Sequence, residues 1–172
     1  MSFIDEIKNK AKQNIKTIIL TESEDKRVLE AAQKVKSEGF AKIILIGKEL
    51  EATKLAKENN IDKSEKFEEY ANAFYELRKA KGITIEDARR IVKDNMYFGT
   101  MMVKLGDADG LVSGACHSTA NTLRPALQIL KTAPGTKLVS AFFLMVVPNC
   151  EYGENGIFVF GDSGLVENPT PE

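Results

Sequence analysis

The segment from Asp109 to Pro125 contains most of the side chains that could do chemistry. A short apolar run, Leu111–Ser113, leads into a turn at Gly114, and a helical segment follows to about Lys131. Free backbone N–H groups at such a turn, together with the helix dipole, attract anions. The pattern leaves two functions open for the hydroxyl groups, which either donate to a bound anion or cap the helix. These hydroxyls belong to Ser113, Ser118, Thr119 and Thr122.

Two arginines extend this anion-site hypothesis. Arg124 directly precedes Pro125, which a helix tolerates only in its first turn or at a kink, so Arg124 is expected near the start of the helix. A planar guanidinium suits phosphate. Arg78 belongs to a basic cluster that ends a predicted helix, where cations also stabilise the helix dipole. Both are therefore candidate phosphate ligands, and a surface role is the alternative for each.

His117 is the only histidine, and it lies inside the proposed turn. An imidazole there could donate to a phosphate or act as a base near neutral pH. The alternative is a structural hydrogen bond. Metal chemistry and nucleotide motifs are not supported, because the sequence has neither ligand spacing for a metal nor a Walker or dinucleotide fingerprint.

The two cysteines, Cys116 and Cys150, are too few for a disulfide framework. An acidic neighbour, Glu151, is expected to raise the pKa of Cys150, which argues against an activated thiolate. The tetrapeptide Gly161–Gly164 spells the nucleophile sequence of trypsin-like serine proteases. Those enzymes are all-β and usually disulfide-bonded, so a helix-rich chain with two cysteines is not expected to be one.

Hydrophobic periodicity predicts an α/β fold with a mostly parallel sheet as the scaffold of these residues. A strand at Thr17–Leu20, a helix over about 25–38 ended by Gly39, and a strand at Lys42–Ile46 form the rhythm of a parallel sheet flanked by helices. Further helices are predicted at Phe3–Ile15, Glu49–Asn59, Glu65–Lys81, Ile85–Lys93 and Tyr97–Leu105.

The turn Thr132–Gly135 predicts a domain boundary, with a first domain over 1–135 and a second over 136–172. Two strongly apolar strands are predicted after it, at Leu138–Val147 and Ile157–Phe160. Such strands need partners on their edges and faces. We therefore expect the second domain to be started and cut within this sequence.

Composition indicates a globular, cytoplasmic protein. Apolar residues make up 43% and charged residues 28%, and the formal net charge of −1 favours neither nucleic acid nor an anionic membrane as a partner. The longest apolar run, Ala141–Val147, falls far short of the roughly 20 residues that cross a membrane. The N-terminal residues have no apolar stretch typical of a signal peptide.

Taken together, seven segments resemble the phosphate acetyltransferase / phosphate butyryltransferase family, and its acetyl branch more closely. The resemblance runs in order through essentially the whole chain. The matching segments are Thr21–Arg27, Tyr70–Lys79, Tyr97–Met102, Asp109–Ala115, Thr122–Pro125, Gln128–Ala133 and Cys150–Gly153.

The resemblance implies a three-layer α/β/α fold like that of isocitrate and isopropylmalate dehydrogenases, with two domains, a cleft between them, and a homodimer. It implies attack of the coenzyme A (CoA) thiolate on acetyl phosphate, giving acetyl-CoA and phosphate without a covalent acyl-enzyme or a permanently bound cofactor. By resemblance, Arg78 and Arg124 hold CoA through its phosphates, and Cys150 matches a non-essential cysteine near the cleft. The candidate CoA-binding residues are thus Arg78, Arg124, Ser113, His117, Ser118 and Thr119.

Two departures from the family qualify this expectation. Family members continue well beyond Glu172, and the part that follows contains the Ser-Arg and Asp residues thought to bind the acyl phosphate and deprotonate CoA. The link from Asn59 to Glu65 is also shorter than usual, and a short strand is expected to be missing there. Three hypotheses therefore stand: the front portion of a phosphate acetyltransferase, an inactive CoA-binding fragment, or part of a phosphate butyryltransferase.

Overall fold

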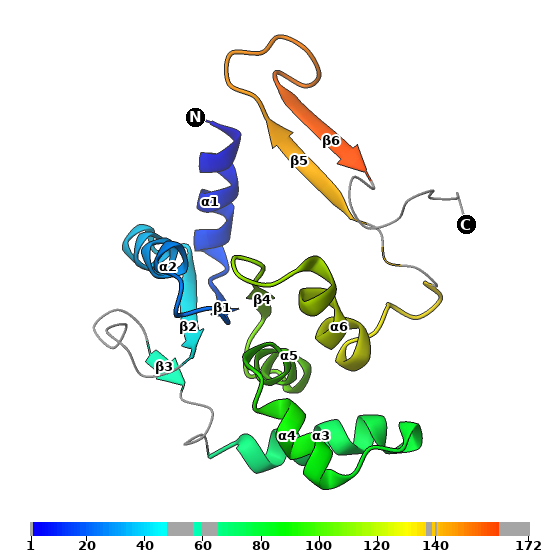
Figure 1. Cartoon of the computed structure of the whole chain (residues 1–172). Coiled ribbons are helices and arrows are strands. Elements are labelled where there is room, and N and C mark those ends of the chain that lie inside the picture. Colours follow the sequence, from blue (N-terminus) through cyan, green and yellow to red (C-terminus); the bar gives the residue numbers. More distant parts are fainter. Residues whose placement is uncertain (1, 48–56, 60–64, 137–138, 140, 162–172) are drawn as a thin grey trace. The chain divides into compact units, whose positions relative to one another are not determined.

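The computed structural model describes residues 2–47, 57–59, 65–136, 139 and 141–161. The chain divides into two compact units, Met1–Lys131 and Thr132–Glu172. The first unit contains helices and parallel strands (Figure 1), so the predicted α/β class is confirmed. Within the described residues, no helix is long and apolar enough to cross a membrane.

Four parallel strands form the sheet of the first unit, in the spatial order β3-β2-β1-β4. Lys16 of β1 pairs with Ala41 of β2, and Ile18 of β1 pairs with Gly110 of β4. Because all four strands are parallel, their carboxyl ends meet at one edge of the sheet, where ligands collect in open α/β sheets. The strands are β1 (Lys16–Leu20), β2 (Ala41–Ile46), β3 (Lys57–Asn59) and β4 (Gly110–Val112).

Strand β3 corrects one of the sequence predictions. The helix predicted to reach Asn59 is wrong over Lys57–Asn59, since these residues pair in parallel with Ile44–Ile46 of β2. The physical reason is that a neighbouring strand supplies the hydrogen bonds, and strand formation depends on such partners more than on local propensity. The expected loss of a strand in the link from Asn59 to Glu65 stays a prediction. Residues 48–56 and 60–64 lie outside the described residues.

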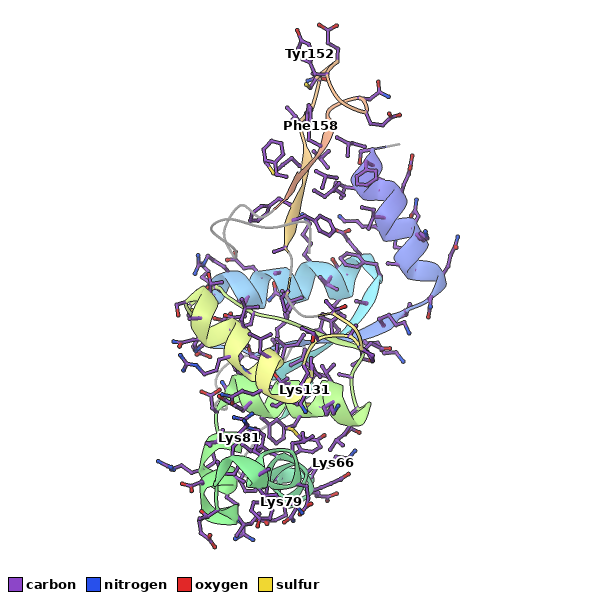
Figure 2. All side chains as sticks on the ribbon, turned by 90° about the vertical axis from the view of Figure 1, so that its right-hand side faces the viewer. Lys66, Lys79, Lys81, Lys131, Tyr152 and Phe158 are labelled. Carbon is purple, nitrogen blue, oxygen red and sulfur yellow. The ribbon has the colours of Figure 1, made fainter. Side chains whose placement is uncertain are left out.

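Helix ends follow the local signals in the sequence. Helix α1 (Phe3–Gln13) begins at a capping box formed by Ser2 and Asp5. Helix α2 (Lys26–Glu38) is capped by Asp25 and ends at Gly39, whose φ of 70° favours glycine. The other helices are α3 (Phe67–Arg78), α4 (Ile85–Val92), α5 (Asn95–Leu105) and α6 (Thr119–Ile129). A 3₁₀ turn, η3 (Lys79–Lys81), continues α3, and Figure 2 labels two of its lysines, Lys79 and Lys81.

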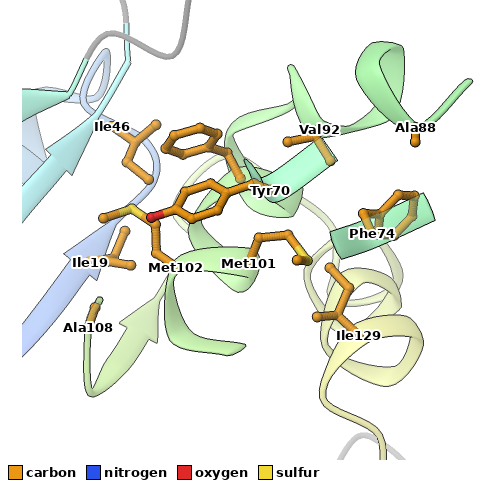
Figure 3. Close-up of a cluster of buried hydrophobic side chains, with 11 residues drawn as sticks. Ile19, Ile46, Tyr70, Phe74, Ala88, Val92, Met101, Met102, Ala108 and Ile129 are labelled. Atoms are coloured by element: carbon orange, nitrogen blue, oxygen red, sulfur yellow. The ribbon is translucent and has the colours of Figure 1, made fainter. Parts of the chain in front are cut away.

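Helix α5 forms the centre of the first unit, packing against α3, α4, α6 and β4. Figure 3 shows Phe74 of α3 and Ile129 of α6 in one buried cluster with Met101 of α5 and with Ile19 and Ile46 of the sheet. On the other face of the sheet, Leu45 packs against Ala32 of α2. Helices thus cover both faces, which gives the expected three layers.

Gly99 allows α5 to lie close to the sheet. A Cβ atom at this position would lie 2.8 Å from Leu111 Cδ1 and 3.1 Å from Thr21 Cγ2. We expect Gly99→Ala to lower the free energy of unfolding by about 1–2 kcal/mol, because overpacking outweighs the roughly 1 kcal/mol gain in helix propensity. Urea denaturation followed by circular dichroism measures the change. An increase in stability would show that α5 can move away from the sheet without cost.

The second unit contains an antiparallel hairpin of β5 (Phe142–Val146) and β6 (Ile157–Gly161). Both strands fall within the predicted β segments, except that β6 extends one residue further. All side chains of β5 are exposed. Residues 137, 138 and 140 and the Asp162–Gly164 part of the protease-like tetrapeptide lie outside the described residues. The domain assignment of 136–172 stays a prediction.

Candidate functional site

The carboxyl ends of β1 and β4 bring two segments together that are far apart in the sequence. After β1, the residues Thr21, Glu22 and Ser23 are all buried. Ser113 follows β4, and its Oγ accepts a hydrogen bond of 2.9 Å from Thr21 Oγ1. Asn95, at the start of α5, donates to the Thr21 carbonyl at 3.1 Å. The glycine turn therefore lies where the sequence predicted it, at the carboxyl edge of the sheet.

The turn binds an anion, and this anion is the chain's own Glu22. The backbone N–H groups of Gly114 and Ala115 each donate to Glu22 Oε2 at 2.9 Å. The N–H of Cys116 donates to Glu22 Oε1 at 2.8 Å, and His117 Nδ1 lies 2.6 Å from the same oxygen. Glu22 is only 1% exposed. The turn was predicted to offer free N–H groups to an external ligand, and at 114–116 that prediction is corrected.

Electrostatics explain why a buried carboxylate is stable here. Burial alone raises the pKa of Glu22, but hydrogen bonds from His117 and from the N–H groups of Cys116, Ala115 and Gly114 lower it to about 2. Glu22 is therefore ionised near neutral pH and can only accept hydrogen bonds. It follows that Nδ1 of His117 carries the proton in this contact. His117 thus makes the structural hydrogen bond that was one of its two predicted functions.

The stability that Glu22 provides is expected to depend on pH. Its folded-state pKa of about 2 lies below the ordinary value of 4.5, so the unfolded chain binds the proton more readily. The resulting stabilisation, about 3 kcal/mol, is fully present above about pH 5 and is lost as the pH falls toward 2. Urea unfolding at several pH values between about 7 and 3 measures it. The difference in stability between the wild type and Glu22→Gln should narrow with falling pH. A constant difference would contradict the lowered pKa of Glu22 in the folded protein.

The hydroxyls that follow the turn serve α6. Ser118 is the N-cap residue, and its Oγ accepts from the Asn121 N–H at 3.3 Å. Thr122 Oγ1 donates to the Ser118 carbonyl at 3.1 Å. Thr119 is the first residue of α6 and is exposed. Of the two functions left open by the sequence, helix capping is the one observed for Ser118.

Arg27 and Cys116 lie beside the turn in a second set of hydrogen bonds. Arg27 Nη2 donates to Asp25 Oδ2 at 2.6 Å and to the Ala115 carbonyl at 2.9 Å. Cys116 Sγ lies 3.2 Å from Asp25 Oδ2, and this hydrogen bond raises the pKa of the Cys116 thiol. A thiol with a raised pKa is a poor nucleophile at neutral pH. Cys116 therefore stays protonated, and both cysteines are free.

The arginines fall into two groups. All five lie within the described residues, and three of them form ion pairs: Arg27 with Asp25, Arg89 with Glu68, and Arg90 with Asp87. Within the described part of the chain, the structure gives no ion pair to Arg78 or Arg124. These two are the candidate phosphate ligands. Arg78 is the last residue of α3, and Arg124 lies in α6 directly before the buried Pro125.

Tyr97 of α5 contacts both helices that carry these two arginines. Its hydroxyl donates to Gln128 Oε1 of α6 at 3.0 Å, and its ring packs edge-on against Phe74 of α3. Burial raises the pKa of Tyr97, while the positive charges of Arg124 and Arg78 act to lower it. Both guanidinium groups are thus within electrostatic reach of one phenol. Both candidates therefore lie on helices that Tyr97 contacts, Arg78 on α3 and Arg124 on α6.

A cavity of about 540 Å³ is lined by Ser113 and not by either of the two arginines. It lies among β4, α5 and α6, and its lining is mostly apolar. Ser113 lines this cavity and also a second one of about 280 Å³, which Glu22 and Arg27 also line. Arg78 and Arg124 line neither. The turn and the arginine pair are therefore two distinct parts of the candidate site.

Sequence reasoning did not identify Glu22, Tyr97 or Gln128 as members of the site. Each lies in a segment that carried the family resemblance, but no local pattern singled it out. Their importance comes from contacts with residues distant in sequence, such as the 92 positions between Glu22 and Gly114. No group of three or more potential metal ligands occurs among the residues that the structure describes.

Comparison with known proteins places these features in a family. The family model described as "Phosphate acetyl/butaryl transferase" matches residues 2–172. A phosphate acetyltransferase from Acetivibrio thermocellus is 60% identical over 98% of this chain, and one from Clostridium acetobutylicum is 48% identical over 100% of this chain. The chain covers 53% and 55% of those two proteins. It thus spans about half the length of the curated relatives that it matches.

Solved structures give the same result. A phosphotransacetylase from Streptococcus pyogenes matches 92% of this chain with a TM-score of 0.81 and 37% identity. The EutD phosphotransacetylase from Staphylococcus aureus matches 97% with a TM-score of 0.81 and 35% identity. This chain covers 51% of each of those structures.

Proposed function

Because the chain belongs to the phosphate acetyl/butyryl transferase family, we propose that it forms the CoA-binding portion of a phosphate acetyltransferase. The reaction is the reversible transfer of an acetyl group between acetyl-CoA and phosphate, which gives acetyl phosphate and CoA. CoA and acetyl-CoA are substrates here, with no permanently bound cofactor. The proposal extends to a cytoplasmic homodimer and to two domains, over 1–135 and 136–172.

One observation carries the CoA-binding part of this proposal. Arg78 and Arg124 come from different helices, lack ion pairs among the described residues, and both act on Tyr97. The three other arginines, among them Arg89 and Arg90, each pair with a carboxylate. Two guanidiniums without an ion pair among the described residues, on two helices that one side chain contacts, suit a ligand with several phosphate charges. CoA carries such phosphates.

The chemistry of acyl transfer requires more than these two cations. Thiolate attack on acetyl phosphate needs a base that takes the CoA proton and positive charge on the phosphoryl oxygens. His117 cannot take a proton at Nδ1, since that atom already donates to Glu22. We therefore assign no catalytic base among the described residues. Ser113, His117, Ser118 and Thr119 are proposed to border the substrate path at the carboxyl edge of the sheet.

The test is formation of acetyl-CoA from CoA and acetyl phosphate by the 172-residue chain, beside a mock purification that excludes host enzyme. CoA binding is measured on the same preparation by calorimetry. CoA binding without turnover supports the CoA-binding proposal. CoA binding with turnover would show in addition that this chain contains the catalytic groups. Absence of CoA binding by the folded chain overturns the proposal. A preference for butyryl phosphate over acetyl phosphate, in a preparation that turns over, would favour the butyryl branch.

A further inference from the structure

Tyr97 lies where three helices of the first unit meet. Its ring centroid is 5.6 Å from that of Phe74 on α3, and the two ring planes are inclined by 80°. Its hydroxyl donates to Gln128 Oε1 on α6 at 3.0 Å. Tyr97 itself belongs to α5, which packs against both of these helices. One side chain thus connects α3 to α6.

The two contacts of Tyr97 lie one helical turn from Arg78 and Arg124, which have no ion pair among the described residues. Phe74 precedes Arg78 by four residues on α3, and Gln128 follows Arg124 by four residues on α6. Residues four apart on a helix lie on the same face. Tyr97 therefore contacts, on each helix, the face from which the arginine projects, so its position affects the separation of the two guanidinium groups.

Packing makes this connection stiff. The Tyr97 ring packs against the buried core cluster that includes Phe74 of α3 and Ile129 of α6, both drawn in Figure 3. The hydrogen bond to Gln128 is partly buried, and such a bond is more stable than one in open solvent. A stiff connection between two cationic groups reduces the entropy lost when both bind one ligand.

We infer that Tyr97 and Gln128 are positioning residues, which hold Arg78 and Arg124 at the separation required to bind the phosphoryl groups of one ligand. This brace, defined as the Tyr97–Gln128 hydrogen bond with the Tyr97–Phe74 ring contact, acts through the arginines rather than on the ligand. The ligand class is a polyanion with two or more phosphoryl charges. The identity of that ligand as CoA rests on the proposed function.

The test compares binding of CoA and of inorganic pyrophosphate to the 172-residue chain by calorimetry at low salt. Tyr97→Phe removes the hydroxyl and keeps the ring against Phe74. We expect it to weaken binding of both ligands about fivefold, and Arg124→Ala to weaken it about tenfold or more. In the Arg124→Ala background, Tyr97→Phe should have less than a twofold effect, since residues that act together are not additive.

Tyr70→Phe is the matched control. Tyr70 lies on α3 in the same core, and its hydroxyl donates to Asp107 Oδ2 at 2.6 Å instead of to α6. This variant also loses a partly buried hydrogen bond, but it should leave both affinities within about twofold. Equal losses of affinity in Tyr70→Phe and Tyr97→Phe would mean that reduced protein stability explains the weaker binding. That result, or an undiminished effect of Tyr97→Phe in the Arg124→Ala background, overturns the inference.

The two ligands separate failure of the inference from failure of the proposed function. If pyrophosphate binds with the expected dependence on Tyr97 and CoA does not bind, the brace is supported and the CoA assignment fails. If CoA binds and Tyr97→Phe changes neither affinity, the CoA assignment stands and the brace fails. Absence of binding by either ligand to the folded wild type overturns both.

Discussion

Glu22→Ala is expected to lower the free energy of unfolding by about 3 kcal/mol. The substitution removes a buried carboxylate that accepts hydrogen bonds from three backbone N–H groups and from His117. Each hydrogen bond to a charged group contributes roughly 1.5–3 kcal/mol. The sum is reduced here because Gly114, Ala115 and Cys116 are exposed, so water can reach their N–H groups. Urea denaturation at neutral pH measures the change.

Two further variants test the cause of this loss. In Glu22→Gln the amide oxygen can still accept hydrogen bonds, while the amide NH₂ faces two donors at the other position. We therefore expect a loss of stability smaller than that of Glu22→Ala. His117→Ala leaves the three backbone hydrogen bonds intact and should cost about 1 kcal/mol. Glu24→Ala changes a neighbouring carboxylate that is exposed, and its free energy of unfolding should lie within about 0.5 kcal/mol of that of the wild type. A Glu22→Ala protein as stable as Glu24→Ala would refute the proposed importance of this carboxylate.

Removal of both unpaired arginines is expected to abolish measurable CoA binding. Each charge-assisted hydrogen bond to a phosphate contributes roughly 1.5–3 kcal/mol, so Arg78→Ala and Arg124→Ala should each weaken binding at least about tenfold. The double variant should weaken it more than about 100-fold. Calorimetry of CoA binding at low and high salt measures this loss, and the remaining affinity should be less sensitive to salt.

Two controls accompany this test: the free energy of unfolding of the arginine variants, and the CoA affinity of Arg90→Ala. Neither Arg78 nor Arg124 has an ion pair within the described residues. The free energy of unfolding of each variant should therefore lie within about 0.5 kcal/mol of that of the wild type. Arg90→Ala removes an arginine that pairs with Asp87 on α4 at 2.7 Å, and CoA affinity should not change. If Arg90→Ala weakens binding as much as Arg124→Ala, binding depends on overall charge rather than on this pair of guanidiniums.

Local signals predicted most elements of the first unit. Helix ends at Ser2 and Gly39 were recognisable because capping depends on residues within about four positions. The strand–helix–strand pattern predicted β1, α2 and β2 for the same reason, since hydrophobic periodicity is local. Strand β3 was missed because it pairs with β2, a partner that local propensity does not reveal.

The candidate site was predicted in part. The position of the turn after β4 was predicted correctly, but its prediction as a site for an external anion was corrected at 114–116, because the sequence could not reveal that Glu22 occupies these N–H groups. Arg78 and Arg124 were selected by family resemblance, and their importance for binding stays a prediction. Tyr97 and Gln128 were not recognised, because a tyrosine and a glutamine on amphipathic helices have no distinctive local pattern.

The sequence by itself determined the α/β class, the family and the order of most helices and strands, β3 excepted, because these depend on short-range patterns and on matched segments. Only the tertiary structure decided which groups meet. It placed Glu22 on a turn 92 or more positions away and placed Tyr97 between two helices that each provide an arginine. Such contacts form when whole elements pack together, and the energy of packing depends on all of the surfaces that meet rather than on any one segment.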